Sequence, residues 1–201
     1  MRARSRALVG VLALWSLTVS LGGAVVAGQA DSKSWLDRPL ANWNKPSATL
    51  PKPPAGRESR EALLRRCQLK PLQSTPAERA VGDAGWIAVP HFDRQIAQGD
   101  IEVVEGTISA DAECQPEISN LFVFVAGHFA GTLSPAPMTA HKDGSSGVVR
   151  ILANDVISAE FLRYRDEDSA CCPSSHVTVR FQVDRSGAAP VLTPIEVRKT
   201  R

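Results

Sequence analysis

The chain has 201 residues, of which 43% are hydrophobic and 22% charged, which fits one globular domain with appendages and excludes a wholly disordered protein. The formal net charge is +2, but residues 1–30 hold three arginines and no acid, so the remainder carries 20 basic and 21 acidic residues. A net charge of −1 provides no general attraction to nucleic acid or to an anionic membrane surface, and we exclude nucleic acid as a partner.

Residues 1–30 have the pattern of a cleavable signal peptide. Three arginines precede an apolar stretch that reaches Val26, and small residues follow it. We expect cleavage after Ala30, with cleavage after Ala27 as the alternative. Membrane contact is expected only if this leader stays uncleaved. No cysteine precedes Cys67, so the lipid-attachment cysteine of a bacterial lipoprotein is absent, and the sequence predicts a periplasmic or secreted protein without a lipid anchor.

Residues 31–56 are predicted to form an extended arm. Five prolines in this stretch disfavour helix and favour an extended backbone. Trp35 and Trp43 stand out in an otherwise polar segment. They are candidate partner-contact residues, or alternatively they dock the arm onto its own domain.

Two short helices are expected after the arm. Residues 57–66 predict the first. The second is better marked, because Thr75 as N-cap, Pro76 at the first helical position and Glu78 three residues after the cap form a capping box. This helix is expected to end near Asp83.

The rest of the chain predicts β-strands, except for a helical turn over residues 91–98 and a loop over residues 134–146. The expected strands are 86–89, 101–109 with a bulge at Gly106, 121–125, 128–133, 147–153, 156–165, 177–183 and 191–197. Short turns between successive strands favour an antiparallel meander with one buried face. The predicted fold class is α+β, predominantly antiparallel β-sheet with two short N-terminal helices packed on it, in one domain over residues 57–198.

Four cysteines in an exported chain predict two disulfides: Cys67, Cys114, Cys171 and Cys172. The Cα atoms of neighbouring residues lie ~3.8 Å apart, below the usual disulfide range of ~4.4–6.8 Å. In an extended segment the two neighbouring side chains also point to opposite faces. We therefore expect Cys171 and Cys172 each to pair with one of Cys67 and Cys114, in an order that the sequence leaves open.

Cys171, Cys172 and His176 are also candidate ligands for copper or zinc, or a candidate thiol-redox site. Such a site requires both cysteines as thiols in an oxidising compartment, and no Cys-x-x-Cys pair is present. Structural disulfides are the favoured interpretation, so no metal site and no cofactor are predicted.

Catalytic motifs are absent from the sequence, and we predict no catalytic residues. The four histidines are His91, His128, His141 and His176, and none has ligand spacing to another. We interpret them as exposed polar residues. A hydrolase that uses His128, His141 or His176 with a serine is a further hypothesis, and the balance favours a protein that is not an enzyme.

Two segments together resemble the LppP/LprE family of bacterial envelope lipoproteins. The first is the strand and glycine turn from Leu121 to Pro135. The second is Tyr164 followed by Cys171-Cys172-Pro173-Ser174 and an alternating strand. The similarity covers roughly residues 77–185. It implies a bacterial protein of the cell envelope and identifies no catalytic residue. Five positions match the family pattern as fold determinants: Gly127, Gly131, Cys171, Cys172 and Pro173.

The sequence therefore predicts an exported, non-catalytic binding or structural module stabilised by disulfides. Its expected partner is an envelope protein, a peptide or a cell-wall component, and its oligomeric state is open. The alternative is a thiol-redox or metal-binding periplasmic protein that uses Cys171, Cys172 and His176.

Overall fold

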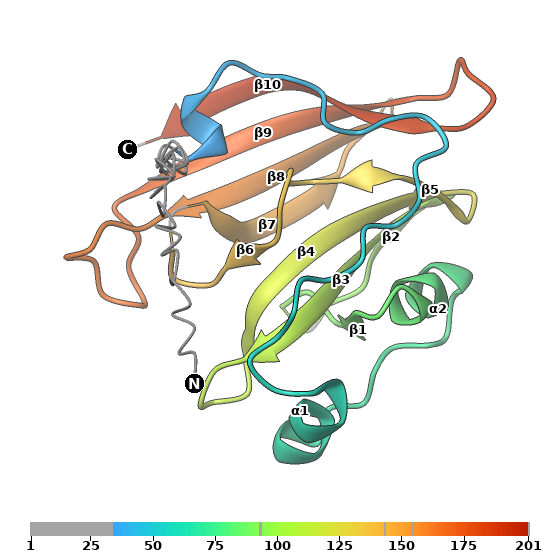
Figure 1. Cartoon of the computed structure of the whole chain (residues 1–201). Coiled ribbons are helices and arrows are strands. Elements are labelled where there is room, and N and C mark those ends of the chain that lie inside the picture. Colours follow the sequence, from blue (N-terminus) through green and yellow to red (C-terminus); the bar gives the residue numbers. More distant parts are fainter. Residues whose placement is uncertain (1–33, 93, 143, 154, 201) are drawn as a thin grey trace, which may run out of the picture. The chain divides into compact units, whose positions relative to one another are not determined.

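Two antiparallel sheets and two short helices make up the part of the chain that the structure describes (Figure 1). This computed structural model describes residues 34–200 except 93, 143 and 154. The predicted signal peptide and both of its candidate cleavage sites lie outside the described residues.

The first sheet has the strand order β1-β3-β4-β5, with β2 paired to β3 and β6 paired to β4. Its strands are β1 (Ile87–Val89), β2 (Ile96–Gln98), β3 (Ile101–Ala110), β4 (Pro116–Val125), β5 (His128–Thr132) and β6 (Met138–Thr139). The second sheet has the order β10-β9-β8-β7. Its strands are β7 (Ser145–Ile151), β8 (Val156–Arg163), β9 (Ser175–Asp184) and β10 (Val191–Thr200).

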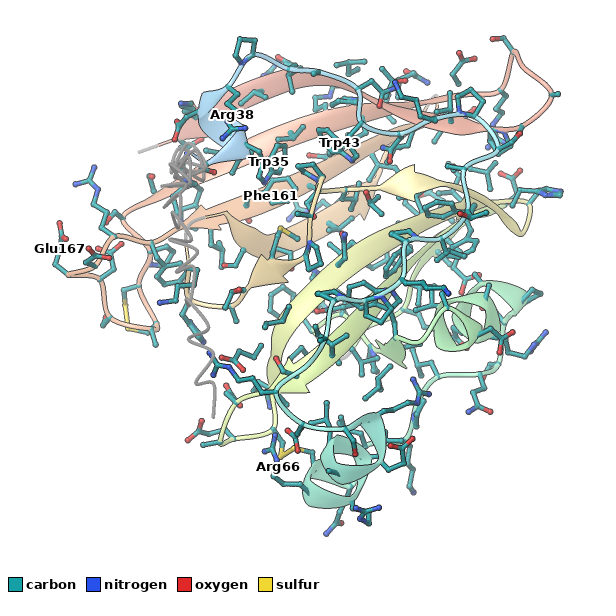
Figure 2. The ribbon with its side chains drawn as sticks, in the orientation of Figure 1. Trp35, Arg38, Trp43, Arg66, Phe161 and Glu167 are labelled. Carbon is teal, nitrogen blue, oxygen red and sulfur yellow. A yellow bond between two sulfur atoms is a disulfide. The ribbon has the colours of Figure 1, made fainter. Side chains whose placement is uncertain are left out.

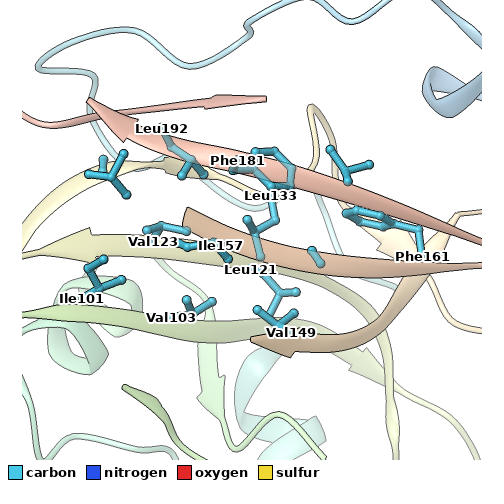
Figure 3. Close-up of a cluster of buried hydrophobic side chains, with 14 of the residues drawn as sticks. Ile101, Val103, Leu121, Val123, Leu133, Val149, Ile157, Phe161, Phe181 and Leu192 are labelled. Atoms are coloured by element: carbon cyan, nitrogen blue, oxygen red, sulfur yellow. The ribbon is translucent and has the colours of Figure 1, made fainter. Parts of the chain in front are cut away.

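The prediction of an α+β protein dominated by antiparallel strands is confirmed, but the single meander is wrong. The chain makes hairpins within the first sheet, passes through β6, and starts a second sheet at β7. One face of each sheet contributes to a shared core (Figure 3). The alternation of apolar and polar residues indicates which face of a strand is buried. It does not indicate where one sheet ends and the next begins, because this depends on packing between distant strands.

The central strand β4 is apolar on both faces, as predicted, because both are covered. Leu121, Val123 and Val125 belong to the core shared with the second sheet, whereas Phe122 and Phe124 pack in a second cluster with helix α2 (Pro76–Asp83). The first sheet is therefore the middle of three layers. Burial on both sides explains the continuous apolar run.

Gly106 is not at a bulge. It pairs directly with Asn120, and the first irregularity follows Thr107. A Cβ at position 106 would lie 2.8 Å from the ring of Phe122 and 2.9 Å from Cβ of Trp86. The glycine is needed for the close approach of these side chains, whose rings pack edge to face at 5.2 Å.

The helices follow the expected signals closely. The capping box of α2 is present: Glu78 N donates to Thr75 Oγ1 at 3.1 Å, and Thr75 N donates to the Glu78 carboxylate at 3.0 Å. The first helix, α1, spans Arg60–Cys67. The helical turn predicted over residues 91–98 is wrong, because the chain there makes a short bridge between His91 and Arg94 and then enters β2.

The disulfides are Cys67–Cys114 and Cys171–Cys172, which corrects the expected pairing (Figure 2). Helix α1 ends at Cys67 beside the β3–β4 turn, where Cys114 lies with a Cα–Cα distance of 5.4 Å. Arg66 fixes this position by donating to the carbonyls of Ala110 and Asp111, both at 3.1 Å.

The neighbouring cysteines bond to each other because the backbone turns there. Cys172 N donates to Ser169 O at 2.9 Å, which closes a β-turn around Ala170 and Cys171. Two side chains that would diverge in an extended strand can meet at such a turn. The prediction assumed the extended case.

The arm packs on the second sheet. It starts with η1 (Trp35–Asp37), a short 3-10 helix whose Leu36 is buried in the main core. Trp35 packs edge to face on Phe161 at 5.0 Å (Figure 2). Trp43 packs edge to face on Phe181 at 6.1 Å. The two tryptophans therefore dock the arm onto the second sheet.

The start of the arm is held by ion pairs to the second sheet. Asp37 accepts hydrogen bonds from Arg163 and Lys199, both at 2.8 Å. These bonds, first that of Arg163 and then that of Lys199, lower the pKa of Asp37 to about 2. The carboxylate thus links the arm to β8 and to β10.

Candidate functional site

A cleft of about 650 Å³ opens between the two sheets. Its walls come from segments far apart in the chain: the end of α1, the β1–β2 connection, β3, the start of β4, the β6–β7 region and the end of β8. The volume lies within the range of small-ligand sites in proteins, roughly 300–1,000 Å³. Apolar side chains from both sheets line it: Leu69, Val89, Pro90, Met138 and Leu162.

A buried histidine joins the two sheets at this cleft. His91 is 5% exposed, and its Nδ1 lies 2.7 Å from Oε2 of Glu105 on β3. Its Nε2 donates to the carbonyl oxygen of Gly147 on β7, also at 2.7 Å. Because both ring nitrogens are bonded, His91 holds the walls together and has no nitrogen left to act as a catalytic base.

Tyr164 and His141 share one acceptor on the opposite side of the cleft. Tyr164 Oη donates to the carbonyl of Ala170 at 3.1 Å, and His141 Nδ1 donates to the same oxygen at 2.9 Å. Their rings meet edge to face at 5.6 Å. Burial, followed by the charge of Asp168, raises the pKa of Tyr164, so the phenol is a protonated donor at neutral pH.

Unfavourable backbone conformations are concentrated around this cleft. Among residues 34–200, as far as they are described, seven non-glycine residues have a positive φ. Four of them line the cleft: Gln68 (50°), Phe92 (46°), Cys114 (62°) and His141 (55°). A bulky residue in this left-handed region is uncommon, and such strain is typical of ligand-binding and active sites.

Phe92 combines this strain with exposure. Its side chain is 61% exposed, the most among the large apolar residues that the structure describes, and its ring lies 4.4 Å from that of His91. An exposed aromatic ring on a strained backbone, next to a buried hydrogen-bonded pair, is energetically unfavourable in the free protein. It is well suited to contact a bound molecule.

Two serine hydroxyls add hydrogen-bonding capacity to the walls. Ser119 and Ser145 line the cleft and are 7% and 6% exposed. Within the described part of the chain neither hydroxyl forms a hydrogen bond with another residue. Both are therefore available to a ligand that carries donors or acceptors.

The structure does not assemble the sites suggested by the sequence. His141 lies in the cleft, but His128 is exposed at the start of β5, and His176 is bonded through Nδ1 to Glu160 at 2.6 Å on the outward-facing side of β9. The three histidines of the hydrolase hypothesis therefore do not converge. In the described ranges no group of three or more His, Cys, Asp and Glu side chains is placed to hold a metal ion.

Sequence reasoning missed the main residues of the cleft. His91 was interpreted as exposed, whereas it is buried between the sheets. The only local signal was Phe92, an apolar residue directly after His91 in a stretch that was expected to form a helical turn. The pairing of His91 with Gly147 depends on contact between the two sheets, which no local pattern encodes.

A search of curated proteins and a search of solved structures found no match for this chain. Over the described residues, no helix is long and apolar enough to cross a membrane. Residues 101–186 match the family model described as LppP/LprE lipoprotein. The matched segment runs from β3 to the turn after β9, and it includes Glu105, Tyr164 and the Cys171–Cys172 pair. This part of the chain is therefore similar to the LppP/LprE lipoprotein family, as the resemblance in its sequence had indicated.

Proposed function

We propose that this chain is an exported protein of the cell envelope whose domain binds a ligand in the cleft between the sheets without transforming it. The similarity of residues 101–186 to the LppP/LprE lipoprotein family supports a location in the envelope. The observation that carries the binding role is Phe92, exposed at the cleft on a left-handed backbone.

The contacts of the histidines support a role without catalysis. A nucleophile needs a base within hydrogen-bonding reach. The described hydrogen bonds of His91 go to Glu105 and Gly147, and that of His141 goes to Ala170. These contacts fix the shape of the site.

A short peptide segment suits the chemistry of the walls. Apolar side chains of such a segment would contact Leu69, Val89 and Leu162, and its backbone groups would meet the hydroxyls of Ser119 and Ser145. Both an envelope protein and the peptide part of the cell wall supply this chemistry. The test below separates these two sources.

The test of binding uses a pair of exposed apolar residues. The protein is titrated with a peptide library and with soluble cell-wall peptides, and binding is followed by chemical-shift changes in NMR spectra. Phe92→Ala is expected to weaken the binding of any hit at least tenfold, as for an aromatic residue at the centre of an interface. Ile195→Ala removes a side chain that is 49% exposed on β10, outside the cleft, and is expected to leave binding unchanged. Equal effects of the two variants would contradict the assignment of the cleft.

The location is proposed to be periplasmic or extracellular, without a lipid anchor. This rests on the absence of a cysteine before Cys67. The intact mass of the protein exported by its host tests it: we expect a chain that starts at Asp31 or Gly28 and carries no acyl group. A mass that includes a lipid, or an intact leader, would refute this part of the proposal.

A further inference from the structure

The wall of the cleft is tied directly to the loop between β8 and β9. Tyr164 and His141 both donate to the carbonyl oxygen of Ala170. Ala170 is in turn the residue before Cys171, inside the β-turn that the bond from Cys172 N to Ser169 O closes. The position of one turn therefore determines where two cleft side chains are held.

The disulfide fixes this turn covalently. It joins residues 171 and 172, so the ring that it closes contains a single peptide unit. The side chains of two neighbouring residues lie on the same side only over a narrow range of backbone conformations. While the bond is intact, Cys171 and Cys172 are confined to that range, and the carbonyl of Ala170 stays oriented toward Tyr164 and His141.

The ends of the loop are held by contacts that do not depend on the disulfide. Asp168 accepts hydrogen bonds from the backbone N–H groups of Arg165 and Ser174, both at 2.8 Å. These bonds do not involve residues 170–172. Breaking the disulfide would therefore leave the loop attached, while the turn would lose its covalent restraint and keep only hydrogen bonds such as that from Cys172 N to Ser169 O.

We propose that the Cys171–Cys172 disulfide is a redox control on the cleft, in which the oxidised form holds the binding wall in place and the reduced form releases it. This inference rests on the proposed binding role of the cleft. In the step itself a dithiol reductant gives two electrons and two protons to the disulfide. The S–S bond breaks, Cys171 and Cys172 become thiols, and the reductant closes its own disulfide.

The accessibility of the two disulfides favours this order of reduction. Cys171 and Cys172 are both exposed, whereas Cys67 and Cys114 are half-buried. A thiolate must reach a sulfur atom to attack it. Limited reduction and alkylation, followed by peptide mapping, should thus label Cys171 and Cys172 before Cys67 and Cys114, and labelling in the opposite order would overturn the proposal.

Tyr164 offers a direct probe of the wall, because it is the only tyrosine in the chain. Protein labelled with 3-fluorotyrosine gives one fluorine NMR resonance, which reports on the hydrogen bond to Ala170. We expect this resonance to shift when the exposed disulfide is selectively reduced, and to lie at the shifted position in the Cys171→Ala/Cys172→Ala variant without reductant. Ser169→Ala is the control, since it changes the same turn while keeping the disulfide. An identical resonance in the oxidised protein and in the double cysteine variant would overturn the proposal.

Binding is measured in parallel with the dye 8-anilinonaphthalene-1-sulfonate, an amphipathic probe of apolar clefts. Its dissociation constant is expected to rise about fivefold on selective reduction and in the double cysteine variant, at the lower end of typical coupling between sites. A shifted tyrosine resonance with unchanged dye affinity would refute control of the cleft. If the oxidised protein binds neither dye nor peptide, the proposed function fails, and the tyrosine resonance still decides whether the disulfide sets the position of the wall.

Discussion

Asn44 in the arm is the residue whose replacement tests the architecture most sharply. Its side chain lies between β5 and β10 and forms hydrogen bonds with the backbone of both strands. Thr132 N donates to Asn44 Oδ1 at 2.9 Å, and Asn44 Nδ2 donates to the carbonyls of Thr132 and Leu192, each at 3.1 Å. One amide thereby connects the edge of the first sheet to the edge of the second.

The expected cost of Asn44→Ala follows from these three bonds. Asn44 is 8% exposed, so solvent replaces the lost partners poorly. Each net hydrogen bond contributes about 1 kcal/mol, and a buried group left without a partner costs about 1–3 kcal/mol. Thr132 O keeps a bond from Trp43 Nε1 at 3.1 Å, so two backbone groups are orphaned. We expect the free energy of unfolding to fall by about 3 kcal/mol, with a fall in Tm of roughly 6–12 °C for a domain of this size.

Urea unfolding followed by tryptophan fluorescence is the measurement. Lys45→Ala is the matched control, because Lys45 follows Asn44 in the same arm and its side chain is exposed. Its loss is expected to cost less than 1 kcal/mol. A change below 1 kcal/mol for Asn44→Ala would refute the conclusion that this amide joins the sheets.

Three further predictions concern the same framework. Gly131→Ala places a Cβ 2.3 Å from Cγ of Asn44 at a φ of +146°, so it should displace the Asn44 side chain. In a urea titration this variant should lose at least as much free energy of unfolding as Asn44→Ala. The double variant should lose little more than either single variant. Asp37→Asn should cost about 1 kcal/mol at pH 7, a value discounted for the partial exposure of the carboxylate. Since the folded pKa of Asp37 is lowered from 3.8 to about 2, this contribution is present above pH 4 and is lost as the pH falls through 2, where the stabilities of the two proteins measured by unfolding should converge. Replacing Cys67 and Cys114 by serine opens a loop with a sequence separation of 47 and should lower the free energy of unfolding by about 4 kcal/mol. Replacing Cys171 and Cys172 should leave the Tm in a calorimetric scan nearly unchanged, because the loop between neighbouring residues is minimal.

Local signals in the sequence predicted local structure well. The capping box at Thr75 and Glu78 specified where α2 starts, and alternation over residues 177–183 identified β9 and its inward face. These patterns are determined by hydrogen bonds and burial within a few residues of each other. The strands outside residues 91–98 were found for the same reason, except β6 (Met138–Thr139), where a loop over residues 134–146 was predicted.

Features that depend on distant contacts were not predictable in this way. The split into two sheets and the bridge through His91 require packing between β3 and β7, and the pairing of Cys67 with Cys114 requires α1 to end at the β3–β4 turn. The vicinal disulfide was excluded by a rule that holds for extended backbones. The cleft depends on all of these features, and for that reason none of its main residues was identified as a binding residue from the sequence.

The docking of the arm has a consequence for when the protein can finish folding. The arm lies near the N-terminal end of the domain, but Asn44 bonds Leu192, and Asp37 pairs with Lys199 of the last strand. Contacts of such long sequence separation form late, because the entropy of closing the loop must be overcome first. Since ribosomes make chains from the N-terminus, nearly the whole domain must be synthesised before these two contacts of the arm can form. Until then the edges of β5 and β10 remain unpaired, which is the state in which sheets of different molecules can join. Transport in an unfolded state, with folding after delivery of the complete chain, would keep this open intermediate brief.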